Sequence, residues 1–173
     1  MGGYALVLFA VVATTFIVTP FLAKFATKVN AIAYPSARSV HEKPMPLIGG
    51  VAMMVGLSAG LLVAMNLKQF DDMFKSSTEP IALILAAGII TFVGFIDDIR
   101  EVSPPAKVAG QVLAGSVMSL FGLTMLYFRV PFASFDYIVL SKDLAPVFTI
   151  AAVVVLANAI NLIDGLNGLA AGI

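Results

Sequence analysis

The sequence predicts an all-α, polytopic integral membrane protein, with about five transmembrane helices forming a single unit over residues 1–173. Three observations predict this class: 60% of the residues are apolar, only 12% are charged, and the uncharged residues fall into long runs. The mean hydropathy is +1.02, whereas an ordinary soluble domain has about a quarter of its residues charged. A chain with this composition is expected to use the bilayer as its solvent.

The composition also excludes three other classes of protein. Ten Lys and Arg residues balance ten Asp and Glu residues, so the chain is not a basic nucleic-acid binder. It contains no cysteine, which excludes a secreted disulfide scaffold. Its apolar content excludes a disordered tail. The expected surroundings are therefore membrane lipid and not nucleic acid.

Five uncharged runs predict the individual helices, because a membrane crossing takes about 20 mostly apolar residues. The runs are 1–23, 44–67, 80–96, 108–128 and 144–163, and the third is the shortest at 17 residues. No charge precedes the first run, and Lys24 and Lys28 follow it. A secretory signal has the opposite arrangement, with basic residues first. The first run is therefore predicted to be a retained span.

The basic residues predict the orientation, because Lys and Arg accumulate on cytoplasmic loops. With the N-terminus outside and the C-terminus cytoplasmic, the first cytoplasmic loop alone carries four of them: Lys24, Lys28, Arg38 and Lys43. We therefore expect a multi-pass protein of the plasma (inner) membrane with its polar site facing the cytoplasm. The external segments 68–79 and 129–143 have the mixed composition of solvated connectors.

Carboxylates stand where two of the runs end. Asp97 and Asp98 follow the third run directly, and Asp164 closes the fifth. Ionisable groups near a span usually face the bundle interior or a water-filled cavity, so they are functional candidates. The alternative is that each carboxylate only ends its helix at the interface, or that Asp97 pairs with Arg100 at i,i+3.

The prolines after the third run bear on how these carboxylates act. Adjacent residues point about 100° apart around a helix, so Asp97 and Asp98 can share one metal or phosphate only if the helix ends or loosens there. The segment Ser103-Pro104-Pro105 favours such an end.

The last run ends in a polar series of one aspartate and three asparagines: Asn158, Asn161, Asp164 and Asn167. On a straight helix the first and last of them face opposite directions, so a break at the glycines 165 and 168 is needed to bring them together. The alternative is that the amides join helices by hydrogen bonds. Four polar side chains within ten residues favour a site.

Three segments resemble motifs of the polyprenyl-phosphate N-acetylhexosamine-1-phosphate transferases. Residues 158–170 look like the NxxNxxDGxDGL motif of that family. Residues 95–101, followed by Lys107 and Gln111, resemble its aspartate-rich motif and downstream K…Q. Residues 38–50 resemble its RKxHxxPxPxxGG motif. The three motifs occur in the family's order, at the predicted cytoplasmic ends of the spans.

The resemblance implies that an N-acetylhexosamine-1-phosphate group moves from a UDP-N-acetylhexosamine to polyprenyl (undecaprenyl) phosphate, with release of UMP. The histidine-containing first motif is similar to the branch that primes cell-envelope polysaccharides such as lipopolysaccharide or teichoic acid. Phospho-MurNAc-pentapeptide transferase of peptidoglycan synthesis is the alternative within the superfamily. A transporter half, for which no inverted repeat is found, and a non-catalytic membrane fragment are the alternatives outside it.

The resemblance also assigns roles to particular residues. It implies that Asp97 and Asp98 bind Mg²⁺, or Mn²⁺ in its place, because such a hard ion takes carboxylates and substrate phosphates as ligands. The catalytic residues it implies are Asp97, Asp98 and Asp164. The substrate-binding residues it implies are Asn158, Asn161, Asn167, Lys107, His41 and Lys43. The alternatives are a loop lysine at Lys107 and a solvated histidine at His41.

Two positions depart from the family pattern, and the extent of the resemblance is limited. Ser39 replaces a basic residue, and Asn167 replaces the second aspartate of DGxDG. An amide both donates and accepts, so Asn167 suits the edge of uracil at least as well. Family members have about ten or eleven transmembrane helices, so the chain is expected to be an amino-terminal half. A homodimer is left open. A GxxxG at Gly56 and Gly60 is adequately explained by chance in a chain with 14 glycines.

Overall fold

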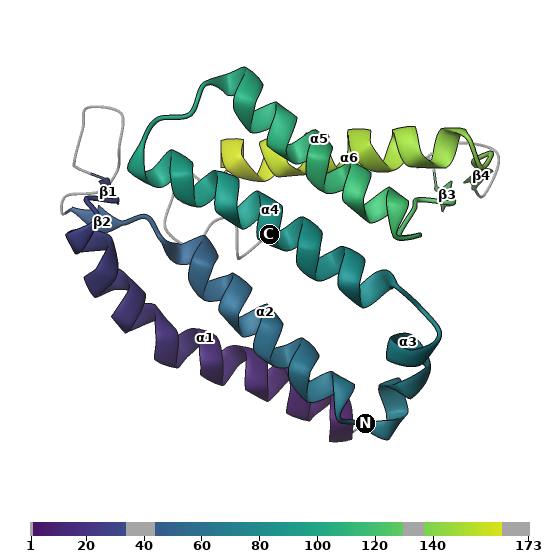
Figure 1. The fold of residues 1–173 in the computed structure, drawn as a ribbon, viewed down its shortest axis with the longest axis horizontal. Coiled ribbons are helices and arrows are strands. Elements are labelled where there is room, and N and C mark those ends of the chain that lie inside the picture. The colour runs from purple at the N-terminus through teal and green to yellow at the C-terminus, as the bar shows by residue number, and fades with distance from the viewer. Residues whose placement is uncertain (1, 34–43, 130–136, 164–173) are drawn as a thin grey trace.

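The computed structural model describes residues 2–33, 44–129 and 137–163, and these residues are mostly helical (Figure 1). Each of the five predicted runs overlaps one long helix. These helices are α1 (Gly2–Lys28), α2 (Gly49–Met65), α4 (Glu79–Ile99), α5 (Pro104–Leu120) and α6 (Leu144–Ile163). The connection from α2 to α4 holds a 3₁₀ turn, η1 (Lys68–Phe70), and a short helix, α3 (Asp71–Lys75). The predicted helical class is confirmed.

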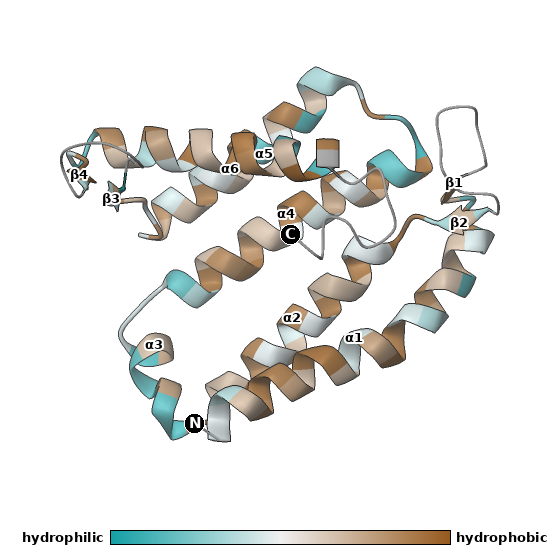
Figure 2. Cartoon of the chain, turned by 180° about the vertical axis from the view of Figure 1, so that it is seen from behind, coloured by the Kyte–Doolittle hydropathy of each residue, from teal (hydrophilic) through white to brown (hydrophobic). Residues whose placement is uncertain are grey.

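The chain is a multi-pass membrane protein. Helices α1, α4 and α6 are long and apolar enough to cross a membrane. A fourth span results if α2 is counted together with the segment η1–α3, which bends away from it by 99°. Helices α2 and α5 have 17 residues each, at the short end of the spanning range. Figure 2 shows the apolar helices and the more polar turns at their ends. The number of spans and their orientation stay predictions.

Helix α5 begins and ends earlier than the predicted run 108–128, because local residues set its two ends. The helix begins at Pro104, because proline is well suited to the first turn, where its missing N–H is not needed. It ends at Leu120, where Gly122 takes a positive φ of 87°. The N–H groups of Gly122 and Leu123 donate to the carbonyls of Ser119 and Met118, which closes the helix in a Schellman motif.

Two small antiparallel sheets were not predicted. β1 (Ile32–Ala33) pairs with β2 (Met45–Pro46), and β3 (Tyr127–Phe128) pairs with β4 (Ile138–Val139). Strands of two residues are too short to leave an alternating pattern in the sequence. The first sheet connects the end of α1 to the start of α2, and the second lies in the connection between α5 and α6.

Small residues set the packing of α2 on α1. The buried residues of α2 recur every fourth position: Ala52, Gly56, Gly60 and Ala64. A Cβ atom on Gly56 would collide with Thr15, and one on Gly60 would collide with Val11. Small residues at this spacing let helix backbones approach closely. The GxxxG therefore serves the contact between α1 and α2 and is not a chance spacing.

Glycines likewise set the packing of α5 on its neighbours. A Cβ atom on Gly110 would lie 2.6 Å from Val93 Cγ2 on α4, and one on Gly115 would lie 2.9 Å from the Cα atom of Ile150 on α6. The long helices thus pack in chain order, α1 on α2, α2 on α4, α4 on α5 and α5 on α6. This order places the end of α4, the start of α5 and the end of α6 at one end of the bundle (Figure 1).

Candidate functional site

A small hydrophobic cluster packs helices α1, α2 and α4 together at the end of the bundle where the motif residues lie. Ala26 from the end of α1, Ala31 and Ile48 are buried together, with Phe95 from the last turns of α4 packed against them. Ala31 directly precedes β1 and Ile48 follows β2 by two residues, so the first sheet adjoins this cluster. Because Phe95 precedes Asp97 by two residues, the cluster holds the carboxylate-bearing end of α4 against the start of α2.

An ion pair joins α4 to α5 at this end. Lys107 Nζ lies 2.7 Å from Asp97 Oδ2, with 37% and 30% of the two side chains exposed. The N–H of Val102 donates to Asp97 Oδ1 at 3.0 Å, so both carboxylate oxygens of Asp97 have partners. The loop between the helices is thereby drawn back onto the end of α4.

The alternative pairing of Asp97 with Arg100 is not formed. Among the described residues, the ion pairs are Lys107 with Asp97 and Lys75 with Asp71. Helix α4 ends at Ile99, and Arg100 has extended backbone angles. The i,i+3 geometry on which that pairing depends therefore does not exist. The helix ends ahead of Ser103-Pro104-Pro105, as the prolines predicted.

Asp98 is half-buried beside Asp97 in the last turn of α4. Within the part of the chain that the structure describes, it has neither a hydrogen-bond nor an ion-pair partner. Two carboxylates in the last turn of a helix lie at the negative end of its dipole, where cations are favoured and anions are not. This end of α4 is therefore suited to attract a cation, and Lys107 supplies only one positive charge.

Two adjacent carboxylates fit a magnesium ion that is shared with a substrate. Mg²⁺ is usually bound by one or two protein carboxylates together with substrate phosphates and water. No group of three or more His, Cys, Asp or Glu residues suited to a metal occurs within the described ranges. Within these ranges the candidate protein ligands are the carboxylates of Asp97 and Asp98, which both lie in the last turn of α4.

A hydrogen bond between two amides continues the polar site from α5 to α6. Asn158 Nδ2 donates to Gln111 Oε1 at 2.7 Å, and both side chains are half-buried. Gln111 lies one turn after Lys107 on α5. Asn161 lies in the same continuous helix as Asn158, but its side chain is exposed. The structure thus links Asp97, Lys107, Gln111 and Asn158 across three helices.

Several predicted site residues lie outside the described residues. They are His41, Lys43, Asp164 and Asn167, together with Arg38 and Ser39 of the first motif. Their roles stay predictions. The bond from Gln111 to Asn158 was not predicted from the sequence, where Gln111 was only a member of a motif. The sole signal for it was that each amide falls in a motif that the resemblance assigns to one site.

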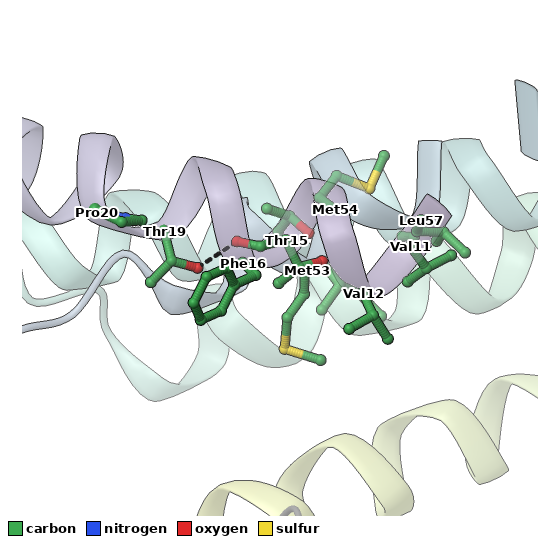
Figure 3. A pocket seen from close by; sticks show the side chains of 13 residues that line it. Val11, Val12, Thr15, Phe16, Thr19, Pro20, Met53, Met54 and Leu57 are labelled. Atoms are coloured by element: carbon green, nitrogen blue, oxygen red, sulfur yellow. Dashed lines mark hydrogen bonds between the residues drawn. The ribbon is translucent and has the colours of Figure 1, made fainter. Parts of the chain in front are cut away.

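A large groove lies elsewhere, between α1, α2 and α4. It encloses about 990 Å³ and is lined by Val11, Val12, Thr15, Phe16, Thr19, Pro20, Gly50, Met53, Met54, Leu57, Ala87, Ile90 and Thr91. Figure 3 shows these side chains, with Thr19 donating a hydrogen bond to the Thr15 carbonyl. None of these described lining residues is charged or belongs to the candidate site, so the groove is distinct from the cluster around Asp97 and Lys107.

Sequence comparisons connect this arrangement to known proteins. Residues 80–173 match the profile of glycosyl transferase family 4. The chain is 36% identical over 159 residues to decaprenyl-phosphate N-acetylglucosaminephosphotransferase of Mycolicibacterium smegmatis. It is 36% identical over 160 residues to the probable undecaprenyl-phosphate N-acetylglucosaminyl 1-phosphate transferase of Bacillus subtilis. A third relative is undecaprenyl-phosphate alpha-N-acetylglucosaminyl 1-phosphate transferase of Escherichia coli, 29% identical over 158 residues.

These alignments cover most of this chain but a minor part of the relatives. They include 92%, 92% and 88% of this chain, and 39%, 42% and 39% of the respective relatives. The chain therefore spans about two fifths of the length of the curated relatives it matches. No solved structure matches the chain.

Proposed function

The chain belongs to glycosyl transferase family 4, and from that premise we propose that it acts in the transfer of N-acetylglucosamine-1-phosphate from UDP-N-acetylglucosamine to a polyprenyl phosphate. The named activity of the relatives supports both the sugar phosphate and the lipid acceptor. The UDP donor, the release of UMP, the magnesium ion and the role in priming cell-envelope polysaccharides are parts of the proposal.

One observation carries the proposal. Side chains from α4, α5 and α6 meet at the same end of the bundle, through the Asp97–Lys107 ion pair and the Gln111–Asn158 hydrogen bond. These four residues belong to the two motifs that resemble the transferase family. In this proposal the Lys107 ammonium group, together with a cation held by the half-buried carboxylate pair, supplies the positive charge that two anionic substrates need.

In the proposed reaction, an oxygen of the polyprenyl phosphate attacks the β-phosphorus of the UDP-sugar. A new P–O bond forms, the bond from that phosphorus to the bridging oxygen of UMP breaks, and the products are UMP and a polyprenyl diphosphate sugar. Catalysis of phosphoryl transfer is mainly positioning and charge neutralisation. In this proposal Lys107 neutralises a phosphate oxygen, in competition with Asp97.

Asp97 and Asp98 would hold the magnesium ion of this reaction. When bound, the ion supplies positive charge that offsets the repulsion between the two phosphate groups. Asp164, Asn161 and Asn167 belong to the proposed nucleotide pocket. The proposed location of the site is the cytoplasmic side of the plasma membrane, where a nucleotide sugar is available.

Purified protein tests the proposal directly. With UDP-N-acetylglucosamine that is radiolabelled in the sugar, undecaprenyl phosphate and Mg²⁺, we expect a radiolabelled lipid product and an equal amount of UMP. Chelation with EDTA should abolish both, and Asp98→Asn should lower the rate by about 100-fold or more. The exposed Asp72→Asn at the other end of the bundle is the matched control. Transfer that persists in EDTA and in Asp98→Asn would remove the proposed metal site.

A further inference from the structure

In the hydrogen bond between Gln111 of α5 and Asn158 of α6, the backbone carbonyl of Val154 determines which side chain is the donor. Asn158 Nδ2 donates to the Val154 carbonyl, one turn earlier in α6, at 2.7 Å, as well as to Gln111 Oε1. A backbone carbonyl only accepts, so the Asn158 amide must turn its nitrogen to Val154. Both hydrogens of that amide are thereby used, and Gln111 can meet them only with its oxygen.

This direction decides which end of the Gln111 amide is left for another partner. Because its oxygen faces Asn158, its NH₂ group is turned away from Asn158. Within the described parts of the chain, that NH₂ group donates to no acceptor. Gln111 follows Lys107 by four residues on α5, so the two share a face and lie about 6 Å apart along the helix axis. Helix α5 thus carries an ammonium group and a free amide NH₂ in succession.

We propose that Gln111 is a substrate-binding residue that donates to a phosphate oxygen, and that Asn158 is the positioning residue that fixes its amide. This inference rests on the proposed function, because the ligand is a phosphate of the transfer reaction. The phosphate belongs either to the UDP-sugar or to the polyprenyl lipid. Asn158 acts through Gln111 in this arrangement and does not touch the substrate itself.

Gln111→Glu separates a structural role of Gln111 from a substrate-binding role. The variant keeps an oxygen to which Asn158 can donate, but it replaces the NH₂ group with a second acceptor. We expect the KM of the substrate whose phosphate is bound to rise roughly 10- to 100-fold, as for the loss of a hydrogen bond to a charged group. The thermal midpoint should stay unchanged. Separate titrations of UDP-N-acetylglucosamine and of undecaprenyl phosphate identify which substrate is affected.

Asn158→Asp tests the positioning role. A carboxylate only accepts, so the Gln111 amide must reverse and donate its NH₂ to residue 158. The same KM should rise by a similar factor, although residue 158 does not contact the substrate. In a Gln111→Leu background the Asn158→Asp change should add less than twofold, because the donor is already absent.

Two matched controls lie outside the site. Asn66 makes the same bond to the preceding turn, from Nδ2 to the Leu62 carbonyl at 2.7 Å, so Asn66→Asp repeats the chemistry of Asn158→Asp elsewhere. Gln69 is exposed, so Gln69→Glu repeats the change at Gln111. Both controls should leave both KM values unchanged.

The outcomes separate this inference from the function on which it rests. Wild-type protein that transfers nothing from UDP-N-acetylglucosamine to undecaprenyl phosphate overturns the proposed function, and this inference with it. Active wild-type protein together with unchanged KM values in Gln111→Glu overturns the inference alone. A lowered thermal midpoint in Gln111→Glu with both KM values unchanged also overturns it, because the residue would then be structural.

Discussion

At the scale of single residues, Asp97 has two competing uses. Its carboxylate already accepts from Lys107 and from the Val102 N–H, and in the proposed reaction it also binds a metal ion. The ion pair places Lys107 within reach of the same ligand. A phosphate that takes Lys107 from Asp97 would leave this carboxylate to the proposed metal ion, so that each charge again has a partner of opposite sign.

This pairing predicts coupled effects of substitution at Asp97 and Lys107. Asp97→Asn and Lys107→Gln should each lower kcat/KM by about 100-fold or more. Lys107→Gln removes a positive charge beside the transferring phosphoryl group, and Asp97→Asn removes a proposed ligand of the magnesium ion. The double variant should lose much less than the product of the two single losses, since residues in direct contact do not act independently. Steady-state kinetics of the four proteins measures the coupling.

The other ion pair supplies the control for this cycle. Lys75 Nζ lies 2.6 Å from Asp71 Oδ2 across one turn of α3, at the far end of the bundle, and the Lys75 side chain is largely exposed. Asp71→Asn and Lys75→Gln should leave kcat/KM unchanged, because exposed pairs contribute little. Strictly additive losses at Asp97 and Lys107 would contradict a shared role.

At the scale of secondary-structure elements, glycines decide how closely the helices that carry the site approach each other. Gly110 lies between Lys107 and Gln111 on α5, and its missing side chain admits Val93 of α4. The separation of α4 and α5 at the Asp97–Lys107 pair therefore depends on a contact about one turn away on each helix. A wider separation would lengthen the ion pair before it disturbed the rest of the bundle.

We expect Gly110→Ala to destabilise the protein by about 1–3 kcal/mol, because the new Cβ atom would overlap Val93 and overpack the interface. Thermal unfolding in detergent measures the loss. Val93→Ala removes the Cγ atoms that the new Cβ would meet, so Gly110→Ala/Val93→Ala should recover part of the stability. Gly88→Ala is the control, because its Cβ atom would lie at an ordinary 3.7 Å from Met54 Cε. Equal losses in Gly88→Ala and Gly110→Ala would contradict this account.

At the scale of the whole molecule, the length of uncharged runs was enough to predict five helices and their order. The signals that moved the ends of α5 are local and could be read in the sequence, at Pro104 and at Gly122. The site was predicted only in part. Asp97 and Asp98 became candidates because charges at the end of a span are costly, and their role stays a prediction. The bond from Gln111 to Asn158 joins residues 47 positions apart, so it depends on helix packing that no local pattern specifies.

The arrangement of helix ends predicts on which side of the membrane each connection lies. The α4–α5 connection and the α5–α6 connection lie at opposite ends of α5, so single cysteines in them should be modified from opposite sides. The chain has no cysteine of its own, and Glu101 and Lys142 are exposed. With the N-terminus outside, an impermeant maleimide should label Lys142→Cys in intact cells and Glu101→Cys only after permeabilisation. Lys68→Cys, in the α2–α4 connection, should behave like Lys142→Cys. The reverse labelling pattern would show that the N-terminus lies inside. Labelling of Lys142→Cys and Glu101→Cys from the same side would contradict α5 as a membrane crossing, because a spanning helix must separate its two ends.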